Sequence, residues 1–289
     1  MAVVGAGTMG VGIARVFAEA GASVRLYARR ESSLEAARER LGESAARMRL
    51  TTSADEALEG AELVVETIVE DPEPKRAILA RGEELASSEA ILTTNTSSLP
   101  LSELAGVLRR PERFAGLHFL NPPELVELVE VVGGERTAPE TLETLADWME
   151  RLGKSPVVLR RDVPGFVVNR LQYALLREAY ALVDAGVCTF ADVDRAVTHG
   201  LGARWAAIGP FETMDLAGLD VHAAVARNLW PQLSSQSEPS PSIARALEEG
   251  ALGVTSGRGL RGDYTPADAV TLSERRERVL RSVRAAREA

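Results

Sequence analysis

The stretch VVGAGTMG, residues 3–10, joins a short apolar strand to the glycine pattern G-x-G-x-x-G. Residues 11–20 follow with apolar side chains at helical spacing, and residues 23–28 have the composition of a second strand. The distance between the two strands fits one β-α-β unit of a parallel sheet. The beginning of the chain therefore predicts a strand–helix–strand unit with a glycine-rich turn at the start of its helix.

This turn has the features of a pyrophosphate site. Gly5 permits the tight turn, Gly7 lets a ligand approach the backbone, and Gly10 allows the helix and the strand to pack closely. The N–H groups at the start of the helix would face the anion. An ordinary strand–helix turn without a ligand is the alternative. We expect the loop to bind a dinucleotide through Gly5, Gly7, Thr8, Met9 and Gly10.

Strands alternate with helices through the first half of the chain, which predicts a doubly wound, mostly parallel sheet of the Rossmann type. Further strands are expected at 63–68, 91–94, 114–119, 128–132 and 156–159, with a charged helix over 31–49 and another helix over 141–152. Beyond the segment RRDVPG (160–165) we expect only helices, at 166–185, 192–198, 220–229, 242–249 and 273–287. The sequence therefore predicts a dinucleotide-binding domain at 1–161 and an all-α domain at 162–289.

Composition narrows the class of protein. The 289 residues carry a net charge of −9, which argues against a nucleic-acid surface. Apolar runs are too short to span a membrane, and the N-terminus does not have the pattern of a signal peptide. One cysteine and three histidines without metal-ligand spacing argue against a disulfide framework and a metal site. We expect a cytoplasmic enzyme that uses no metal.

The end of the second strand bears on the choice between NAD and NADP. Sites that prefer NAD usually place Asp or Glu here, where it binds the ribose hydroxyls. This chain has Ala28, followed by Arg29 and Arg30, whose guanidinium groups can pair with a 2′-phosphate. The sequence favours NADP. In the alternative, both arginines are ordinary surface residues and NAD binds.

A histidine and a carboxylate form the candidate catalytic pair. His118 lies in an apolar strand that ends at a Pro-Pro turn, so the chain can double back and bring Glu130 to the imidazole. A carboxylate beside histidine fixes the tautomer and stabilises the imidazolium that forms when the ring takes a proton. Glu127 is an equally good partner on charge alone, and a lone histidine in a strand is often only a core residue.

Several segments, in this order, resemble the L-3-hydroxyacyl-CoA dehydrogenase family: GAGTMG (5–10), LVVETIVE (63–70), NTSSL (95–99), FAGLHFLNPP (114–123) with LVEVV (128–132), DVPGFVVNR (162–170) and GPFETMDLAGLD (209–220). The resemblance implies that His118 is the base and Glu130 its partner. It implies that Ser97 and Asn169 bind the substrate oxygen, in a cleft between the domains.

The resemblance also implies that Glu70 and Lys75 lie near the nicotinamide ribose. Asn95 directly follows a strand, at the sheet edge where ligands bind, and is a further candidate for contact with the coenzyme. The family further implies a homodimer built through the helical domain.

The expected activity is reversible oxidation of a 3-hydroxyacyl-CoA to a 3-oxoacyl-CoA. The segment GLGARWAAIGPF (200–211) resembles more closely the relatives that oxidise gulonate or carnitine. A thioester on an acyl carrier protein, a free hydroxy acid, and a role in nucleotide binding without turnover therefore remain alternatives. Neither a nucleic acid nor a membrane is an expected partner.

Overall fold

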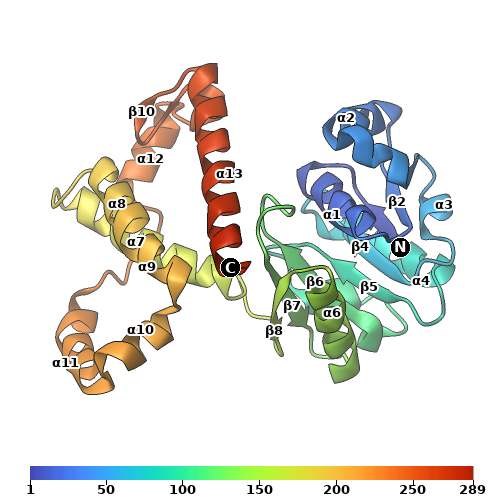
Figure 1. Ribbon diagram of the computed structural model, residues 1–289, viewed down its shortest axis with the longest axis horizontal. Coiled ribbons are helices and arrows are strands. Elements are labelled where there is room, and N and C mark those ends of the chain that lie inside the picture. Colours follow the sequence, from blue (N-terminus) through green and yellow to red (C-terminus); the bar gives the residue numbers. More distant parts are fainter. Residues whose placement is uncertain (289) are drawn as a thin grey trace. The chain divides into compact units, whose positions relative to one another are not determined.

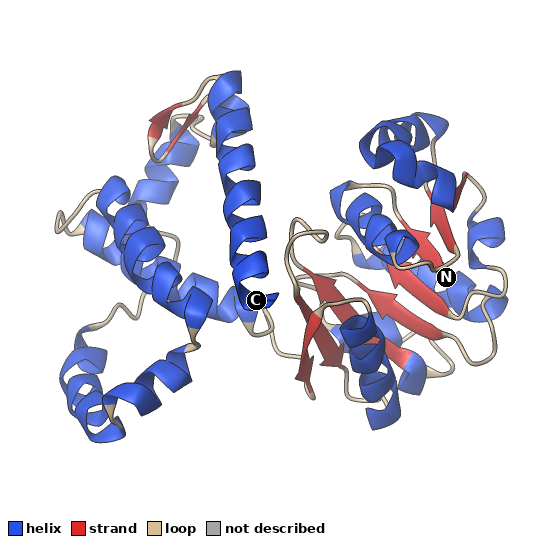
Figure 2. Cartoon of the chain, viewed as in Figure 1, coloured by secondary structure: helices blue, strands red, loops and turns tan. Residues whose placement is uncertain are grey.

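The computed structural model describes residues 1–288, which separate into two compact units, Met1–Arg170 and a second that begins at Leu171. The first unit holds the sheet, and the second is mainly helical (Figures 1 and 2). Within the described residues, no helix is both long and apolar enough to cross a membrane.

The sheet of the first unit has eight strands in the order β3-β2-β1-β4-β5-β6-β7-β8. All neighbouring pairs are parallel except β6 and β7, which are antiparallel. The strand order reverses between β1 and β4, and this reversal forms the crevice in which such sheets bind ligands. The predicted doubly wound sheet is confirmed. Its strands are β1 Ala2–Val4, β2 Val24–Tyr27, β3 Met48–Thr51, β4 Leu63–Glu66, β5 Ile91–Thr94, β6 Phe114–Phe119, β7 Leu128–Gly133 and β8 Ser155–Leu159.

Helices cover both faces of this sheet. Successive residues of a strand point to opposite faces of the sheet. Val65 packs in the apolar cluster that includes residues of helix α1, and Val64 packs in the cluster that includes Leu79 of helix α4. Strands buried on both faces explain the continuous apolar runs in the sequence. The helices of this unit are α1 Thr8–Glu19, α2 Glu31–Leu41, α3 Ala54–Leu58, α4 Pro72–Leu85, α5 Leu101–Ala105 and α6 Pro139–Arg151.

The predicted helix over 31–49 is wrong in its last part. Helix α2 ends at Leu41, because Gly42 adopts a positive φ of 56° that stops the helix. A 3-10 segment follows, and β3 then adds an edge strand to the sheet. Met48 and Leu50 of β3 are half-buried against the core, while the charged residues between and around them made the stretch look like a solvated helix.

The second unit consists mainly of helices, and α7 enters it from the first unit. Two short antiparallel strands, β9 Arg258–Gly259 and β10 Gly262–Asp263, correct the expectation that only helices follow residue 165. Strands of two residues are too short to show an alternating apolar pattern. The helices are α7 Val168–Asp184, α8 Phe190–Ala196, α9 Gly202–Ala207, α10 Pro210–Ala217, α11 Leu219–Leu229, α12 Pro241–Glu248 and α13 Pro266–Glu288.

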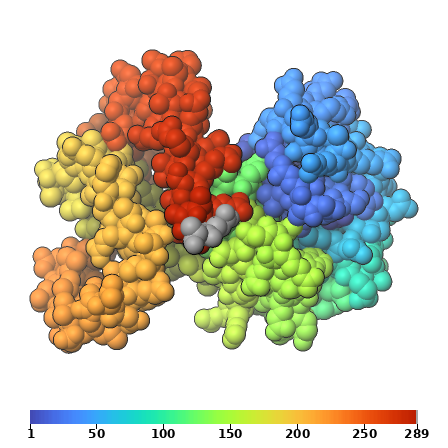
Figure 3. All heavy atoms as spheres, viewed as in Figure 1, coloured from blue at the N-terminus to red at the C-terminus, as the bar shows by residue number. Residues whose placement is uncertain are grey.

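Apolar side chains of the second unit lie on its surface. Within residues 171–287, Ser240 alone is buried, whereas Phe211, Leu216 and Trp230 are 79%, 82% and 71% exposed. Phe211 and Leu216 lie on α10, and Trp230 lies in the turn after α11. Helices α10 and α11, drawn in orange, stand apart from α12 and α13 (Figures 1 and 3). The helical unit of a single chain therefore leaves apolar side chains of several described helices exposed.

Candidate active site

The glycine loop joins β1 to α1 and has the geometry of an anion site. Gly5 has a φ of 116°, and a Cβ at Gly10 would collide with the carbonyl oxygen of Gly5. Gly7 is different, because nothing lies within 4 Å of the place where its Cβ would be. Gly7 is also the N-cap of α1, and no side chain accepts the N–H groups at the start of this helix. The exposed Thr8 and half-buried Met9 complete a loop that fits a pyrophosphate.

The end of β2 presents two guanidinium groups beside the loop. Ala28 is buried, whereas Arg29 and Arg30 are exposed. Arg30 is the N-cap residue of α2, and no side chain caps this helix. In the part of the chain that the structure describes, neither guanidinium forms an ion pair. Both are therefore free to meet an anion at the start of α2.

The antiparallel pairing of β6 with β7 sets His118 directly opposite Glu130. The Nδ1 atom of His118 lies 2.7 Å from Oε2 of Glu130, and both side chains are buried. A carboxylate only accepts hydrogen bonds, so the ring proton is on Nδ1 and Nε2 carries the free lone pair. The structure thus brings Glu130, rather than Glu127, to the imidazole.

The other oxygen of Glu130 holds the start of α7. Oε1 accepts the backbone N–H groups of Val167 at 2.8 Å and Val168 at 3.0 Å. Burial tends to raise the pKa of Glu130, but hydrogen bonds from His118, Val168 and Val167 outweigh it and hold the pKa below its ordinary value. The group is therefore a carboxylate that stabilises a positive charge on the neighbouring ring.

Phe166 completes the surroundings of the imidazole. Its ring meets that of His118 edge to face, with 5.4 Å between the ring centroids. Phe166 has a φ of 50°, the only positive φ of a residue other than glycine among those described. Asn169, half-buried in the first turn of α7, follows three residues later. One short segment thus connects the histidine to a residue that the resemblance assigned to the substrate.

The loop after β5 contributes Asn95 and Ser97. Oδ1 of Asn95 accepts the N–H of Phe119 at 2.8 Å, and this bond ties the end of β5 to the residue after His118. Ser97 is exposed, and its N–H donates to Oε1 of Glu70 at 3.1 Å. Asn95 therefore uses its carbonyl oxygen within the fold and has its amide NH₂ left for a ligand.

Glu70 links this loop to Lys75. Burial raises the pKa of Glu70, but Thr96, Lys75, Ser98 and Ser97 together lower it below the ordinary value. Lys75 is only 1% exposed, and its ammonium group lies 3.3 Å from Oε2 of Glu70. Of the two residues that the resemblance assigned to the nicotinamide ribose, Glu70 is accessible to a ligand, and Lys75 lies beneath it.

The sequence analysis missed Glu66, a fully buried carboxylate that pairs with Lys75 at 2.8 Å. An acidic residue that ends an otherwise apolar run, LVVE, was the available signal. The described residues contain no group of His, Cys, Asp or Glu side chains arranged to hold a metal ion.

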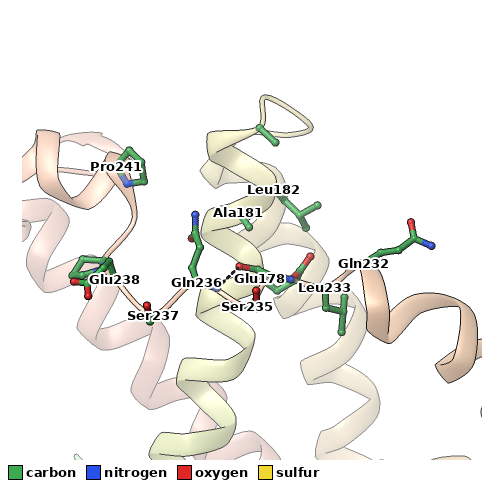
Figure 4. Close-up of a pocket in the computed structure, with 13 residues that line it drawn as sticks. Glu178, Ala181, Leu182, Gln232, Leu233, Ser235, Gln236, Ser237, Glu238 and Pro241 are labelled. Atoms are coloured by element: carbon green, nitrogen blue, oxygen red, sulfur yellow. Dashed lines mark hydrogen bonds between the residues drawn. The ribbon is translucent and has the colours of Figure 1, made fainter.

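A cavity of about 820 Å³ lies in the second unit, between α7 and the polar loop 232–241 (Figure 4). The N–H of Ser234 donates to Oε2 of Glu178 at 2.7 Å, which fastens the loop to the helix. The cavity is lined by none of the predicted site residues, so it contributes nothing to the chemistry of His118 and Glu130.

Comparison with known proteins shows the family of this chain. The NAD binding domain of 3-hydroxyacyl-CoA dehydrogenase matches residues 1–163, and the C-terminal domain of the same enzyme matches residues 165–262. The pig (Sus scrofa) mitochondrial hydroxyacyl-coenzyme A dehydrogenase is 36% identical and covers 89% of this chain and 88% of its own length.

A second kind of relative matches more of the chain. The 5-formyl-3-hydroxy-2-methylpyridine 4-carboxylate 5-dehydrogenase of Mesorhizobium japonicum is 35% identical over 98% of this chain and 96% of its own. A crystal structure of an enzyme of this name, described as an NAD⁺-dependent dismutase, has a TM-score of 0.95 at 35% identity and covers 100% of this chain and 98% of that one. The two family models together cover most of the chain, and the chain belongs to the 3-hydroxyacyl-CoA dehydrogenase family of oxidoreductases.

Proposed function

We propose that this protein oxidises the C3 hydroxyl of a 3-hydroxyacyl thioester to a 3-oxoacyl thioester, reversibly, with a nicotinamide coenzyme. The contact between His118 and Glu130 carries the proposal, because it fixes the imidazole in the tautomer that accepts a proton at Nε2. Membership of a family of hydroxyacyl-CoA dehydrogenases supports the thioester as substrate.

In the forward direction, Nε2 of His118 removes the proton of the C3 hydroxyl. The O–H electron pair then forms the C3=O double bond, and the C3–H bond breaks with its electrons. The bound coenzyme supplies the acceptor of this hydride. Glu130 stabilises the imidazolium, while Ser97 and Asn169 orient the substrate oxygen. Proton transfer by a positioned base typically contributes about 10²- to 10⁴-fold.

The coenzyme would lie along the carboxyl ends of β1, β4 and β5. The open space at Gly7 and the uncapped start of α1 support a pyrophosphate there. Glu70 and Asn95 fit the nicotinamide ribose, and Lys75 acts through Glu70, since its ammonium group is buried.

We infer that the coenzyme is NADP. Ala28 leaves no carboxylate at the end of β2 to repel a 2′-phosphate, and Arg29 and Arg30 stand exposed at the start of α2. Glu31, in the first turn of that helix, opposes this preference with one negative charge. Two guanidinium groups outweigh one carboxylate at an exposed site.

We also propose that residues 1–161 bind the coenzyme and that residues 162–289 complete the substrate site and form a homodimer. The exposed apolar side chains of α10 and α11 support the dimer, because a second copy of the chain would cover them. Sedimentation equilibrium at micromolar concentration should give twice the monomer mass. A monomer would contradict the proposal.

A small free acid is the second candidate substrate. The match to a pyridine-carboxylate dehydrogenase over 98% of the chain supports it, against 89% for the hydroxyacyl-CoA relative. An aldehyde hydrate carries a hydroxyl and a hydrogen on the same carbon, as a secondary alcohol does. The same base would therefore remove its proton while hydride leaves for the coenzyme, and the product would be a carboxylic acid.

A substrate panel distinguishes the candidates. It contains 3-hydroxybutyryl-CoA, the same acyl group on a carrier protein, a pyridine aldehyde with an adjacent carboxylate, and a free hydroxy acid, each with NAD⁺ and NADP⁺. Reduced coenzyme is followed by its absorbance. A higher kcat/KM for the CoA thioester than for the other three supports the leading proposal. Turnover of the free acids alone supports the second, and coenzyme binding without any turnover contradicts both.

A further inference from the structure

Glu66 is a buried carboxylate that the proposed mechanism does not use. It is the last residue of β4, and the strand register places it between Val4 of β1 and Thr94 of β5. It therefore sits at the crevice where the strand order reverses, with none of its surface exposed. A fully buried charge is costly unless it is paired and hydrogen-bonded.

Donors occupy both oxygens of Glu66. The ammonium group of Lys75 lies 2.8 Å from Oε1 and 2.9 Å from Oε2. The N–H of Ile68 donates to Oε1 at 2.6 Å, and the hydroxyl of Thr94 donates to Oε2 at 2.6 Å. Glu66 is thus held by the sheet and in turn holds Lys75.

Glu70 is shared between Lys75 and the loop after β5. Its Oε2 lies 3.3 Å from the ammonium group, a longer contact than either of those to Glu66. Its Oε1 accepts the N–H groups of Ser97 at 3.1 Å and Ser98 at 3.2 Å, the hydroxyl of Ser98 at 2.9 Å, and the hydroxyl of Thr96. The position of Lys75 therefore decides how firmly Glu70 stays with the loop.

We propose that Glu66 is a positioning residue: by anchoring Lys75 on β4, it leaves Glu70 to hold the Ser97–Ser98 loop in place. Without the charge of Glu66, the ammonium group has Glu70 as its one remaining carboxylate and moves toward it. Glu70 then loses bonds to the loop. The expected effect on turnover rests on the proposed function, in which Ser97 orients the substrate oxygen. The expected effect on the loop itself does not depend on that function.

Glu66→Gln tests this directly, because it keeps the shape of the side chain and removes its charge. Glu83→Gln is the matched control. Glu83 is also a buried carboxylate, and it accepts the N–H groups of Arg109 at 2.9 Å and Arg110 at 2.7 Å. It thus performs a comparable role for a different loop.

The main measurement is amide hydrogen exchange, resolved by residue, in the full-length protein without ligand. In Glu66→Gln we expect exchange at Ser97 and Ser98 to be roughly tenfold faster, which corresponds to the loss of one charge-assisted hydrogen bond. In Glu83→Gln the faster exchange should appear at Arg109 and Arg110 instead. Unchanged exchange at Ser97 and Ser98 in Glu66→Gln, or an equal change there in both variants, would overturn the proposal.

Glu66→Asp keeps the test informative should the glutamine variant not fold. Aspartate retains the negative charge, but its side chain is shorter by one carbon–carbon bond, so the carboxylate lies about 1.5 Å farther from Lys75. Exchange at Ser97 and Ser98 should then rise less than tenfold but above that of the wild type, and no rise in a folded Glu66→Asp protein counts against the proposal.

Kinetics on whichever panel substrate turns over give a second readout. Glu66→Gln should lower kcat/KM about tenfold or more, because small displacements of positioning groups are costly, whereas Glu83→Gln should leave it within twofold. If no substrate of the panel turns over, the proposed function fails, and the exchange measurement still decides the role of Glu66.

Discussion

Glutamine at position 130 would disturb both groups that depend on Glu130. The carboxylate serves His118 with one oxygen and the N–H groups of Val167 and Val168 with the other. Glutamine has one acceptor oxygen and one NH₂ group, so either His118 or the start of α7 keeps an acceptor, but not both. If the NH₂ group faced Val167 and Val168, two part-buried donors would be unpaired, at about 1 kcal/mol or more each.

The amide oxygen should therefore stay with the helix start, and the NH₂ group should face the imidazole. Nδ1 of His118 must then accept a hydrogen bond, which moves the ring proton to Nε2 and removes the base. The expected loss is the contribution of a positioned base, about 10²- to 10⁴-fold in kcat, or about 2.7–5.5 kcal/mol of transition-state stabilisation. Three hydrogen bonds lose their charge assistance as well, so the free energy of unfolding should fall by about 1–3 kcal/mol.

The assay compares kcat, KM and coenzyme affinity of the wild type, Glu130→Gln and the control Glu83→Gln. Coenzyme affinity should stay within about threefold in all three proteins, because the glycine loop is intact. A Glu130→Gln enzyme that retained more than a tenth of the wild-type kcat would refute the tautomer argument. So would a loss of kcat that Glu83→Gln matched.

Acid unfolding gives an independent check on Glu130. Its pKa in the folded protein lies below the ordinary 4.5, so the carboxylate contributes stability that is present above pH 4.5 and lost as the pH falls through the folded-state pKa. Glu130→Gln lacks this contribution. The difference in unfolding free energy between the two proteins should therefore narrow below pH 4.5. A difference that stayed constant from pH 7 to pH 3 would contradict the sign of the shift.

Four further variants address the base, the coenzyme and the glycine loop. His118→Ala should lower kcat about 10²- to 10⁴-fold and leave coenzyme affinity, measured by fluorescence titration, unchanged; near-full activity would exclude His118 as the base. Replacing Arg29 and Arg30 together by alanine should weaken NADPH binding about tenfold or more and leave NADH binding within twofold, since charge-assisted bonds to the 2′-phosphate are lost; equal effects on both coenzymes would argue against NADP. Gly7→Ala should fold normally but bind coenzyme poorly, whereas Gly10→Ala should lower the melting temperature, because only at Gly10 does the added Cβ meet the backbone; calorimetry with coenzyme titration separates the two.

Local patterns were sufficient for much of the first unit. The strand–glycine–helix pattern at residues 3–20 predicted β1 and α1, and the buried strands gave continuous apolar runs because helices cover both faces of the sheet. The pattern failed at β3, a short edge strand in which Arg49 separates two half-buried apolar residues. It failed again at β9 and β10, where each strand has two residues.

What the sequence by itself determined is the class of fold, the glycine loop and the set of candidate side chains, because these depend on residue type and on spacing along the chain. Only the tertiary structure decided which side chains meet. The antiparallel register of β6 and β7 selected Glu130 over Glu127 as the partner of His118, and the packing of α4 against β4 buried Lys75 in contact with Glu66 and Glu70. Contacts of this kind join residues distant in sequence, and their geometry depends on strand register and helix packing, which no local pattern encodes.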